Sequence, residues 1–233
     1  EKIHREIVKN AAEAAHVTGQ GFLIVNRGDS TLRGHYPLET NTIADEMEKQ
    51  CGVKMDGEIL CPYFREGGRF TVDDIRYVLD GKELVPVAQT EFARDKTFGY
   101  RHSDLKAYIE EKTAGAYHAL DVVSIKLEDL RSISIGKITE QLMTVRGFEK
   151  VIVNATDNYD VKVFCIALYH ALAAGKHFCF RTAAAFVKAL GNISDRPLLT
   201  RSDMVRDQNP VGGIIVVGSH TQKTTVPIGR AHV

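Results

Sequence analysis

The chain lacks an excess of charge of either sign, and this absence limits the partners it can have. Its 233 residues include 30 Lys and Arg and 30 Asp and Glu, so the formal net charge is zero. Proteins that bind nucleic acid or an anionic membrane surface usually carry a basic excess or a basic face. No apolar run is long enough to cross a bilayer. We therefore expect neither a nucleic acid nor a membrane as a partner.

The cysteines and histidines lack the spacing of a metal site. None of the four cysteines forms a C-x-x-C pair or lies at zinc-finger distance from a histidine. Cys61, Cys165 and Cys179 lie inside apolar runs, where cysteine usually acts as a small core residue. We expect free thiols, a cytoplasmic location and no metal ligands among these residues.

Two common catalytic motifs are also missing. No serine stands in the G-x-S-x-G context of a hydrolase elbow, and no Gly-Lys-Thr stands at Walker spacing. The sequence therefore leaves the catalytic residue unknown.

What the chain does contain is a regular alternation of apolar segments. Each expected strand is short and continuously apolar, and each expected helix repeats its apolar residues every three or four positions. The expected helices cover 3–17, 37–50, 138–144, 161–174 and 183–190, and the expected strands cover 22–25, 59–61, 122–125, 151–155 and 178–180. This alternation predicts an α/β fold with a layered, mostly parallel sheet flanked by helices.

One region departs from that alternation. Asp80 and Gly81 lie between two apolar runs, 75–78 and 84–87, which is a strong signal for a β-hairpin. We expect this hairpin to be inserted into the α/β domain. Ser103 follows it and is expected to cap a helix over 104–112.

The most informative segment is 26–35, between the first expected strand and the second helix. It combines Arg27, Asp29, Ser30, Thr31 and Arg33 with two glycines. Arginine binds a carboxylate or phosphate through two hydrogen bonds, while hydroxyls and an aspartate bind sugar hydroxyls. The composition favours a site for a small, hydroxylated anion. A polar turn in which Asp29 or Ser30 caps backbone groups is the alternative.

Two other strands end in polar residues, 154–157 and Arg181 with Thr182. The carboxyl ends of parallel strands share one edge of a sheet, so these residues are expected near Arg33. Arg181 thereby joins Arg27, Asp29, Ser30, Thr31 and Arg33 as a candidate substrate-binding residue. Asp157 has an alternative role as the cap of the following helix.

A second domain is expected near the carboxyl end. Residues 190–210 have the composition of a linker, and a new apolar strand follows over 213–217. We place a first domain at 1–205 and the start of a second α/β domain at 206–233. Gly218 and Ser219 form a turn whose backbone N–H groups suit a phosphate, although the signal is weak by itself.

These segments together resemble the four-carbon acid sugar kinase family. The likeness rests on blocks in matching order up to residue 225: 27–39 (RGDSTLRGHYPLE), 61–64 (CPYF), 66–69 (EGGR), 90–95 (TEFARD), 98–100 (FGY), 111–113 (EKT), 154–155 (NA), 180–184 (FRTAA) and 213–220 (GIIVVGSH). The resemblance implies ATP-dependent phosphorylation of acids such as threonate, erythronate or their oxo forms, with Mg²⁺ bridging the phosphates. It places Asp29, Ser30, Thr31 and Arg33 in the sugar-acid site, and Gly218 and Ser219 against ATP.

The chain also departs from that family. It has no Asp-Asp-x-Thr-Gly segment, and residues 226–233 do not continue the family pattern. We therefore expect a partial version of the kinase that is inactive alone. The alternative is a non-catalytic remnant or binding module that holds a sugar acid or a protein partner. An incomplete sheet leaves apolar edges, which favours a homo-oligomer.

Overall fold

The computed structural model describes residues 1–205 of the chain. It divides into two units, Glu1–Ser194 and Asp195–Val233, and the second is described only as far as Val205. The described part of the second unit holds one short helix, α8 (Arg201–Met204), whose first turn is capped by Thr200 and Asp203. The rest of this section concerns the first unit.

The centre of the first unit is a five-stranded parallel sheet in the order β1-β8-β2-β7-β6. Every pair of neighbouring strands is parallel, as the alternation of strands and helices predicts. The strands are β1 (Asn26–Arg27), β2 (Gly57–Cys61), β6 (Val123–Ile125), β7 (Glu149–Val153) and β8 (Phe178–Thr182). The carboxyl ends of β1, β8 and β2 therefore lie side by side, where open α/β sheets place their ligands.

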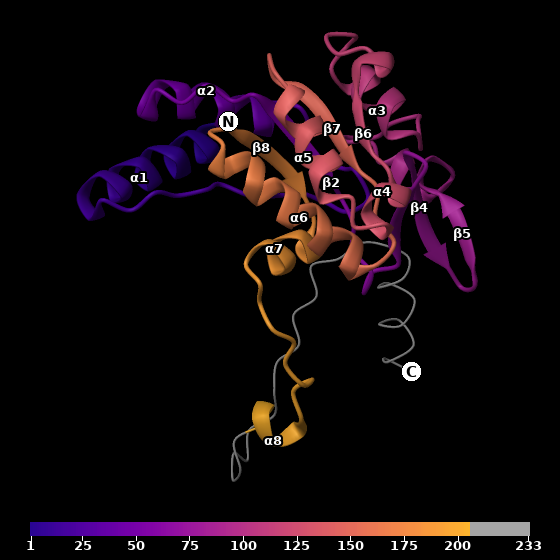
Figure 1. Ribbon diagram of the computed structural model, residues 1–233. Helices are drawn as coiled ribbons and strands as arrows, with labels where there is room; N and C mark the ends of the chain where they lie inside the picture. Colours follow the sequence, from indigo (N-terminus) through magenta and orange to yellow (C-terminus); the bar gives the residue numbers. More distant parts are fainter. Residues whose placement is uncertain (206–233) are drawn as a thin grey trace. The chain divides into compact units, whose positions relative to one another are not determined.

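The helices of the first unit are α1 (Lys2–Thr18), α2 (Leu38–Cys51), α3 (Leu105–Lys112), α4 (Leu127–Arg131), α5 (Ile135–Thr144), α6 (Asn158–Ala173) and α7 (Ala184–Leu190). Alternating side chains of the central strands enter two separate cores. Ile59 and Val151 enter one core together with α4–α7, while Leu60 and Ile152 enter the other with α3. The helices α1 and α2 pack on the same side as Cys179 of β8. The first unit thus has three layers, with helices on both faces of the sheet (Figure 1).

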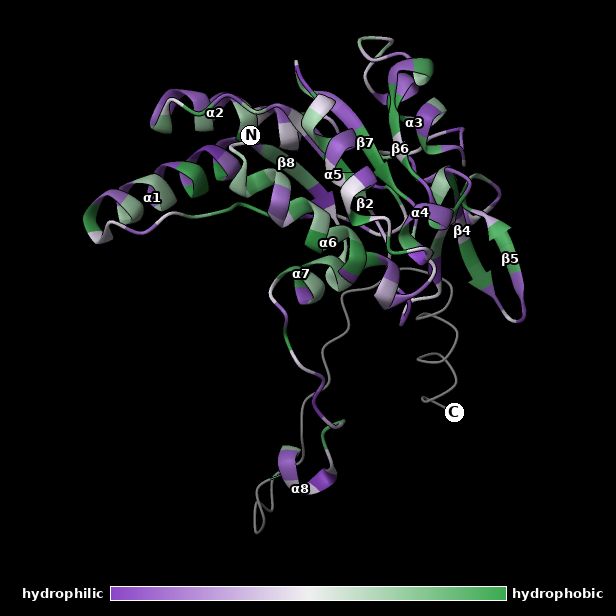
Figure 2. Ribbon diagram, viewed as in Figure 1, coloured by the Kyte–Doolittle hydropathy of each residue, from purple (hydrophilic) through white to green (hydrophobic). Residues whose placement is uncertain are grey.

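The helices begin and end where local chemistry permits. Asp157 caps α6 and accepts a hydrogen bond from the backbone N–H of Tyr159, while Gly19 and Gly52 end α1 and α2 in the left-handed conformation. Hydrophobic and hydrophilic residues are interleaved along α1, as expected for a surface helix (Figure 2).

A second, antiparallel sheet holds the predicted hairpin. It has the order β3-β4-β5, with bounds Arg69–Val72, Ile75–Asp80 and Glu83–Pro86. Gly81 adopts a positive φ of 61° in the turn, which confirms the Asp80-Gly81 signal. Thr71 exchanges backbone hydrogen bonds with Ala155 just beyond β7, and so attaches the small sheet to the carboxyl edge of the large one.

Two local predictions are wrong. The apolar run 22–25 does not form a strand, because only Asn26 and Arg27 of this segment pair with β8. Phe22 and Ile24 instead pack among the residues between α1, α2 and β8. The cap of α3 is Asp104 rather than Ser103, whose hydroxyl accepts a hydrogen bond from the backbone N–H of Ala88.

No helix in the described range 1–205 is both long enough and apolar enough to span a membrane.

The packing of β2 generates a stability prediction for two glycines. A Cβ on Gly57 would lie 2.5 Å from Val145 Cγ1 and 2.8 Å from the carbonyl oxygen of Glu149, whereas a Cβ on Gly136 would meet nothing within 4 Å. We expect Gly57→Ala to lower the free energy of unfolding by about 2 kcal/mol through overpacking. Gly136→Ala, in the first turn of α5, should raise it by roughly 0.5 kcal/mol. Urea unfolding checks both; equal effects at the two positions would contradict this packing.

Candidate functional site

The loop after β1 is held together by the carboxylate of Asp29. Asp29 accepts hydrogen bonds from the hydroxyl of Thr31 at 2.6 Å and from Nε of Arg33 at 2.7 Å. Its other oxygen accepts the backbone N–H of Thr31 at 3.1 Å. The loop is therefore ordered by its own side chains, which is the capping role left open by the sequence, but the same contacts also orient Arg33.

The chemistry of the loop favours an ionised Asp29. Partial burial opposes ionisation of this carboxyl, but the hydrogen bonds from Thr31 and the charge and hydrogen bond of Arg33 outweigh it and lower its pKa. Within the loop, Leu32 is buried and has a positive φ of 69°. Its carbonyl oxygen accepts the hydroxyl of Tyr108 at 2.9 Å, and that of Thr31 accepts the hydroxyl of Tyr100 at 2.6 Å. These bonds fix the loop to the core.

Arg76 of β4 links the small sheet to this loop. Its guanidinium is fully buried and donates to the carbonyl oxygen of Ser30 at 2.7 Å, to Thr71 Oγ1 at 3.1 Å and to the carbonyl oxygen of Pro62. Burial lowers the pKa of Arg76 to about 9, so it remains a cation at neutral pH. Its hydrogen-bond acceptors are carbonyls and a hydroxyl, which leaves its charge uncompensated by a carboxylate in direct contact.

Arg33 and Arg69 both contact the ring of Phe92. Phe92 lies in the 3₁₀-helix Glu91–Arg94, and the two guanidinium carbons lie 5.1 Å and 5.3 Å from its ring centre. Nε of Arg69 is buried and has no hydrogen-bond partner in the described structure. A buried donor without a partner costs free energy, so this nitrogen is a candidate to bind a ligand oxygen.

The cluster has a positive balance of charge. Arg33, Arg69 and Arg76 supply three cations, while Asp29 and Asp95 supply two carboxylates, with Asp95 Oδ2 lying 3.7 Å from Nη1 of Arg33. Burial and the charge of Arg33 lower the pKa of Arg69, although the charge of Asp29 opposes this. A region with this balance attracts an anion.

Arg181 lies behind the loop and supports it. Its side chain is only 3% exposed, donates to Glu39 Oε2 at 2.8 Å, and donates to the carbonyl oxygen of Arg33 at 2.9 Å. A Cβ on Gly28 would lie 2.8 Å from Arg181 Nη1, so this glycine allows the backbone to pass close to the guanidinium. The structure thus places Arg181 as a positioning residue that holds the loop between β8 and α2.

The remaining predicted residues lie as follows. Ser30 contributes its carbonyl oxygen to Arg76, and Arg27 is exposed at the end of β1. Asn154 is buried and joins β7 to Asp74 of the small sheet, accepting the backbone N–H of Asp74 at 2.8 Å. Asp157 caps α6 and lies 2.9 Å from Arg65, and is thus accounted for by structural contacts.

Two arginines of the cluster, Arg69 and Arg76, were not among the binding residues predicted from the sequence. Arg69 follows a double glycine that reads as a turn, and Arg76 stands inside the hairpin as if it were a solvent-facing residue. Their approach to Asp29 depends on the folding of the small sheet over the strand ends, which no local pattern encodes. The block EGGR was the available signal for Arg69.

Gly218 and Ser219, the candidate nucleotide-binding residues, lie outside the described residues. Within 1–205, no group of three or more His, Cys, Asp or Glu side chains is arranged to hold a metal ion.

Comparison with known proteins now defines the class. A model of the sugar-binding N-terminal domain matches residues 1–190, so the chain belongs to that family, the amino-terminal domain of four-carbon acid sugar kinases. The sequence resemblance is thereby confirmed. No curated protein matches the chain.

Two solved structures share the fold. The Haemophilus influenzae protein HI1011 aligns with a TM-score of 0.52, and a protein of Salmonella typhimurium LT2 with 0.53. Each is 13% identical, and the alignment covers 80% of this chain but 42% of the solved one. The chain therefore spans less than half the length of these solved proteins.

The ion pair between the buried Arg181 and the partly buried Glu39 generates a stability prediction. Replacing it with Met leaves Glu39 without its cation and frees the loop carbonyl of Arg33. We expect Arg181→Met to lower the free energy of unfolding by about 3 kcal/mol. Arg27→Ala, at an exposed position, should change it by less than about 0.5 kcal/mol. Chemical denaturation of both variants measures the difference, and similar values for the two would contradict the supporting role.

The lowered pKa of Asp29 predicts how its contribution depends on pH. A carboxyl with a depressed pKa in the folded state stabilises the protein above its unfolded pKa of about 3.9, and this contribution is lost as the pH falls through the folded value. We expect the stability difference between wild type and Asp29→Asn to be constant from pH 7 to 5 and to shrink below about pH 4. Urea unfolding across this range measures it; a difference that grows on acidification would contradict the assignment.

Proposed function

We propose that the cluster around Asp29 binds a four-carbon sugar acid. The observation that carries this proposal is the positive balance of Arg33, Arg69 and Arg76 beside an ionised carboxylate and a hydroxyl. A sugar acid offers the complementary groups, because it has one carboxylate and several hydroxyls on a short chain. Membership of a sugar-binding family supports the choice.

Each residue has a distinct part in this proposal. Nε of Arg33 is bound to Asp29, so its terminal nitrogens are the ones that face the ligand carboxylate. Arg69 contributes its unpartnered Nε. Asp29 accepts a hydrogen bond from one ligand hydroxyl, and Thr31 donates one to another. Arg76 and Arg181 keep the loop in place and do not contact the ligand.

At the level of the reaction, we propose ATP-dependent phosphorylation of the bound acid. Phosphoryl transfer depends on positioning and on neutralisation of charge more than on covalent chemistry, and Mg²⁺ supplies part of that neutralisation when bound. The described residues would hold and orient the acceptor acid. The residues expected against ATP, Gly218 and Ser219, are not described, so no step is assigned to them.

A second candidate is a module that binds the acid without phosphorylating it. The Asp29 cluster is consistent with it, because the described groups suit binding of the acid and none of them is assigned a step in phosphoryl transfer. Calorimetric binding of a sugar acid together with an absence of ADP formation from Mg-ATP would support this reading. ADP formation that depends on the sugar acid would support the kinase.

Binding is tested by titrating the chain with threonate and erythronate in a calorimeter. Loss of a charge-assisted contact costs about 1.5–3 kcal/mol, so Arg33→Ala should weaken binding roughly 10- to 150-fold. Arg27→Ala removes an equal charge from the exposed end of β1, next to the loop, and should leave the affinity within about twofold. An unchanged affinity in Arg33→Ala would remove Arg33 from the site.

A further inference from the structure

A cavity of about 310 Å³ lies at the edge of the sheet opposite to the Asp29 cluster. It is close to the amino ends of β2 and β7, whereas the cluster is at their carboxyl ends. Nothing in the proposed sugar-acid site uses it. Its volume falls at the lower end of the range typical of small-molecule sites.

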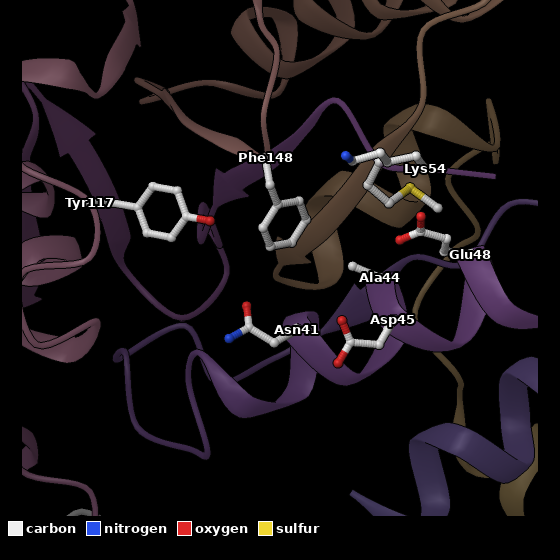
Figure 3. A pocket seen from close by; sticks show the side chains of 8 residues that line it. Asn41, Ala44, Asp45, Glu48, Lys54, Tyr117 and Phe148 are labelled. Atoms are coloured by element: carbon white, nitrogen blue, oxygen red, sulfur yellow. The ribbon is translucent and has the colours of Figure 1, made fainter.

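Four separate segments build the wall of this cavity. The face of α2 contributes residues spaced three and four apart, and the other side chains come from the loop before β2, the loop before β6 and the turn before β7. The lining residues are Asn41, Ala44, Asp45, Glu48, Lys54, Met55, Tyr117 and Phe148. Figure 3 shows the carboxylates of Asp45 and Glu48 pointing from α2 into the space beside the Phe148 ring.

Phe148 is held in an unusual backbone conformation to reach this place. Gly147 and Phe148 both have positive φ, 63° and 64°, and the second value is rare for a bulky side chain. The backbone N–H of Phe148 donates to the carbonyl oxygen of Asp56 at 2.8 Å. Such strain persists where surrounding contacts determine the conformation, and it is frequent at ligand-binding positions.

Behind the aromatic wall lies a buried ion pair. Nζ of Lys150 is 2.7 Å from Glu58 Oε2, and both side chains are 1% exposed. The same nitrogen lies 3.7 Å from the centre of the Phe148 ring and 4.1 Å from that of Tyr117. The two rings therefore already contact one cation, that of Lys150, and Glu58 neutralises its charge. This buried pair adds no net charge to the cavity.

Unlike the Lys150–Glu58 pair, the charged side chains on the rim of the cavity have no partner within the described residues. Asp45, Glu48 and Lys54 are exposed, and their side chains form neither an ion pair nor a hydrogen bond within residues 1–205. Two carboxylates against one ammonium give the rim a negative balance. Ala44, Met55 and Phe148 supply an apolar surface next to it.

We infer that this cavity binds a small organic amine. The ammonium group of the ligand lies between Asp45 and Glu48, and its apolar or aromatic part lies against Phe148 and Met55. Lys54 disfavours a second cationic group at the far end. The inference is independent of the sugar-acid site, because no residue is shared between the two.

Three ligands that differ chiefly in charge test the inference. Tyramine is a cation, tyrosol is neutral and 4-hydroxyphenylacetate is an anion, and all three carry the same phenol ring. Titration of the isotopically labelled chain, followed by NMR, should show binding of tyramine at least fivefold tighter than tyrosol, and no saturable binding of the anion. Amide shifts should be confined to α2, the loop before β2, the loop before β6 and the turn before β7.

Charge-removing variants distinguish binding at this cavity from non-specific attraction of a cation to the protein surface. Asp45→Asn with Glu48→Gln should weaken tyramine binding at least fivefold, while Glu13→Gln, an exposed carboxylate on α1, should leave it within twofold. The amide spectrum verifies that each variant is folded. If the double variant does not fold, the tyramine affinities of the single variants Asp45→Asn and Glu48→Gln give the test instead. Equal affinities for the three ligands, or no saturation by tyramine at millimolar concentration, would overturn the inference.

Discussion

The structure of the candidate site depends on one buried guanidinium, that of Arg181. Arg181 at the end of β8 reaches Glu39 on α2 and the backbone of Arg33, so one side chain connects a central strand, a helix and the polar loop. The energetic constraint is strict, because a charge this deeply buried must be paired. That requirement fixes the loop, and the loop in turn fixes Asp29 and Arg33.

Arg76 is equally buried, but carbonyl oxygens and a hydroxyl stabilise its guanidinium in place of a carboxylate. It binds carbonyl oxygens in the loops that follow β1 and β2 and so holds the small sheet over the strand ends. Its charge adds to those of Arg33 and Arg69, and the result is a region that favours an anion. In the proposed site, support and recognition are therefore separate: the buried guanidiniums of Arg76 and Arg181 hold the loop, and the partly exposed Arg33 and Arg69 are the ones proposed to contact the acid.

The sequence predicted the architecture well, because periodicity and turn chemistry are local. The parallel sheet, α1, α2 and the Asp80-Gly81 hairpin are all confirmed. The strand predicted at 22–25 is wrong because apolar character alone does not distinguish a paired strand from a packed loop. Composition pointed to the loop with Asp29, Thr31 and Arg33; the structure joins these side chains through the Asp29 carboxylate, and their role in binding stays a prediction. Arg69 and Arg76 were underweighted, because the fold of the small sheet over distant residues brings them there. The separate cavity at Phe148 depends on a backbone conformation with no sequence signal.

The central claim is that a carboxylate is bound between Arg33 and Arg69. A crystal structure of the chain grown with threonate or erythronate tests it most directly. The account predicts density for the acid with its carboxylate within hydrogen-bond distance of both guanidiniums and a hydroxyl facing Asp29. A ligand located elsewhere on the first unit, with Arg33 and Arg69 contacting only protein atoms, would contradict it.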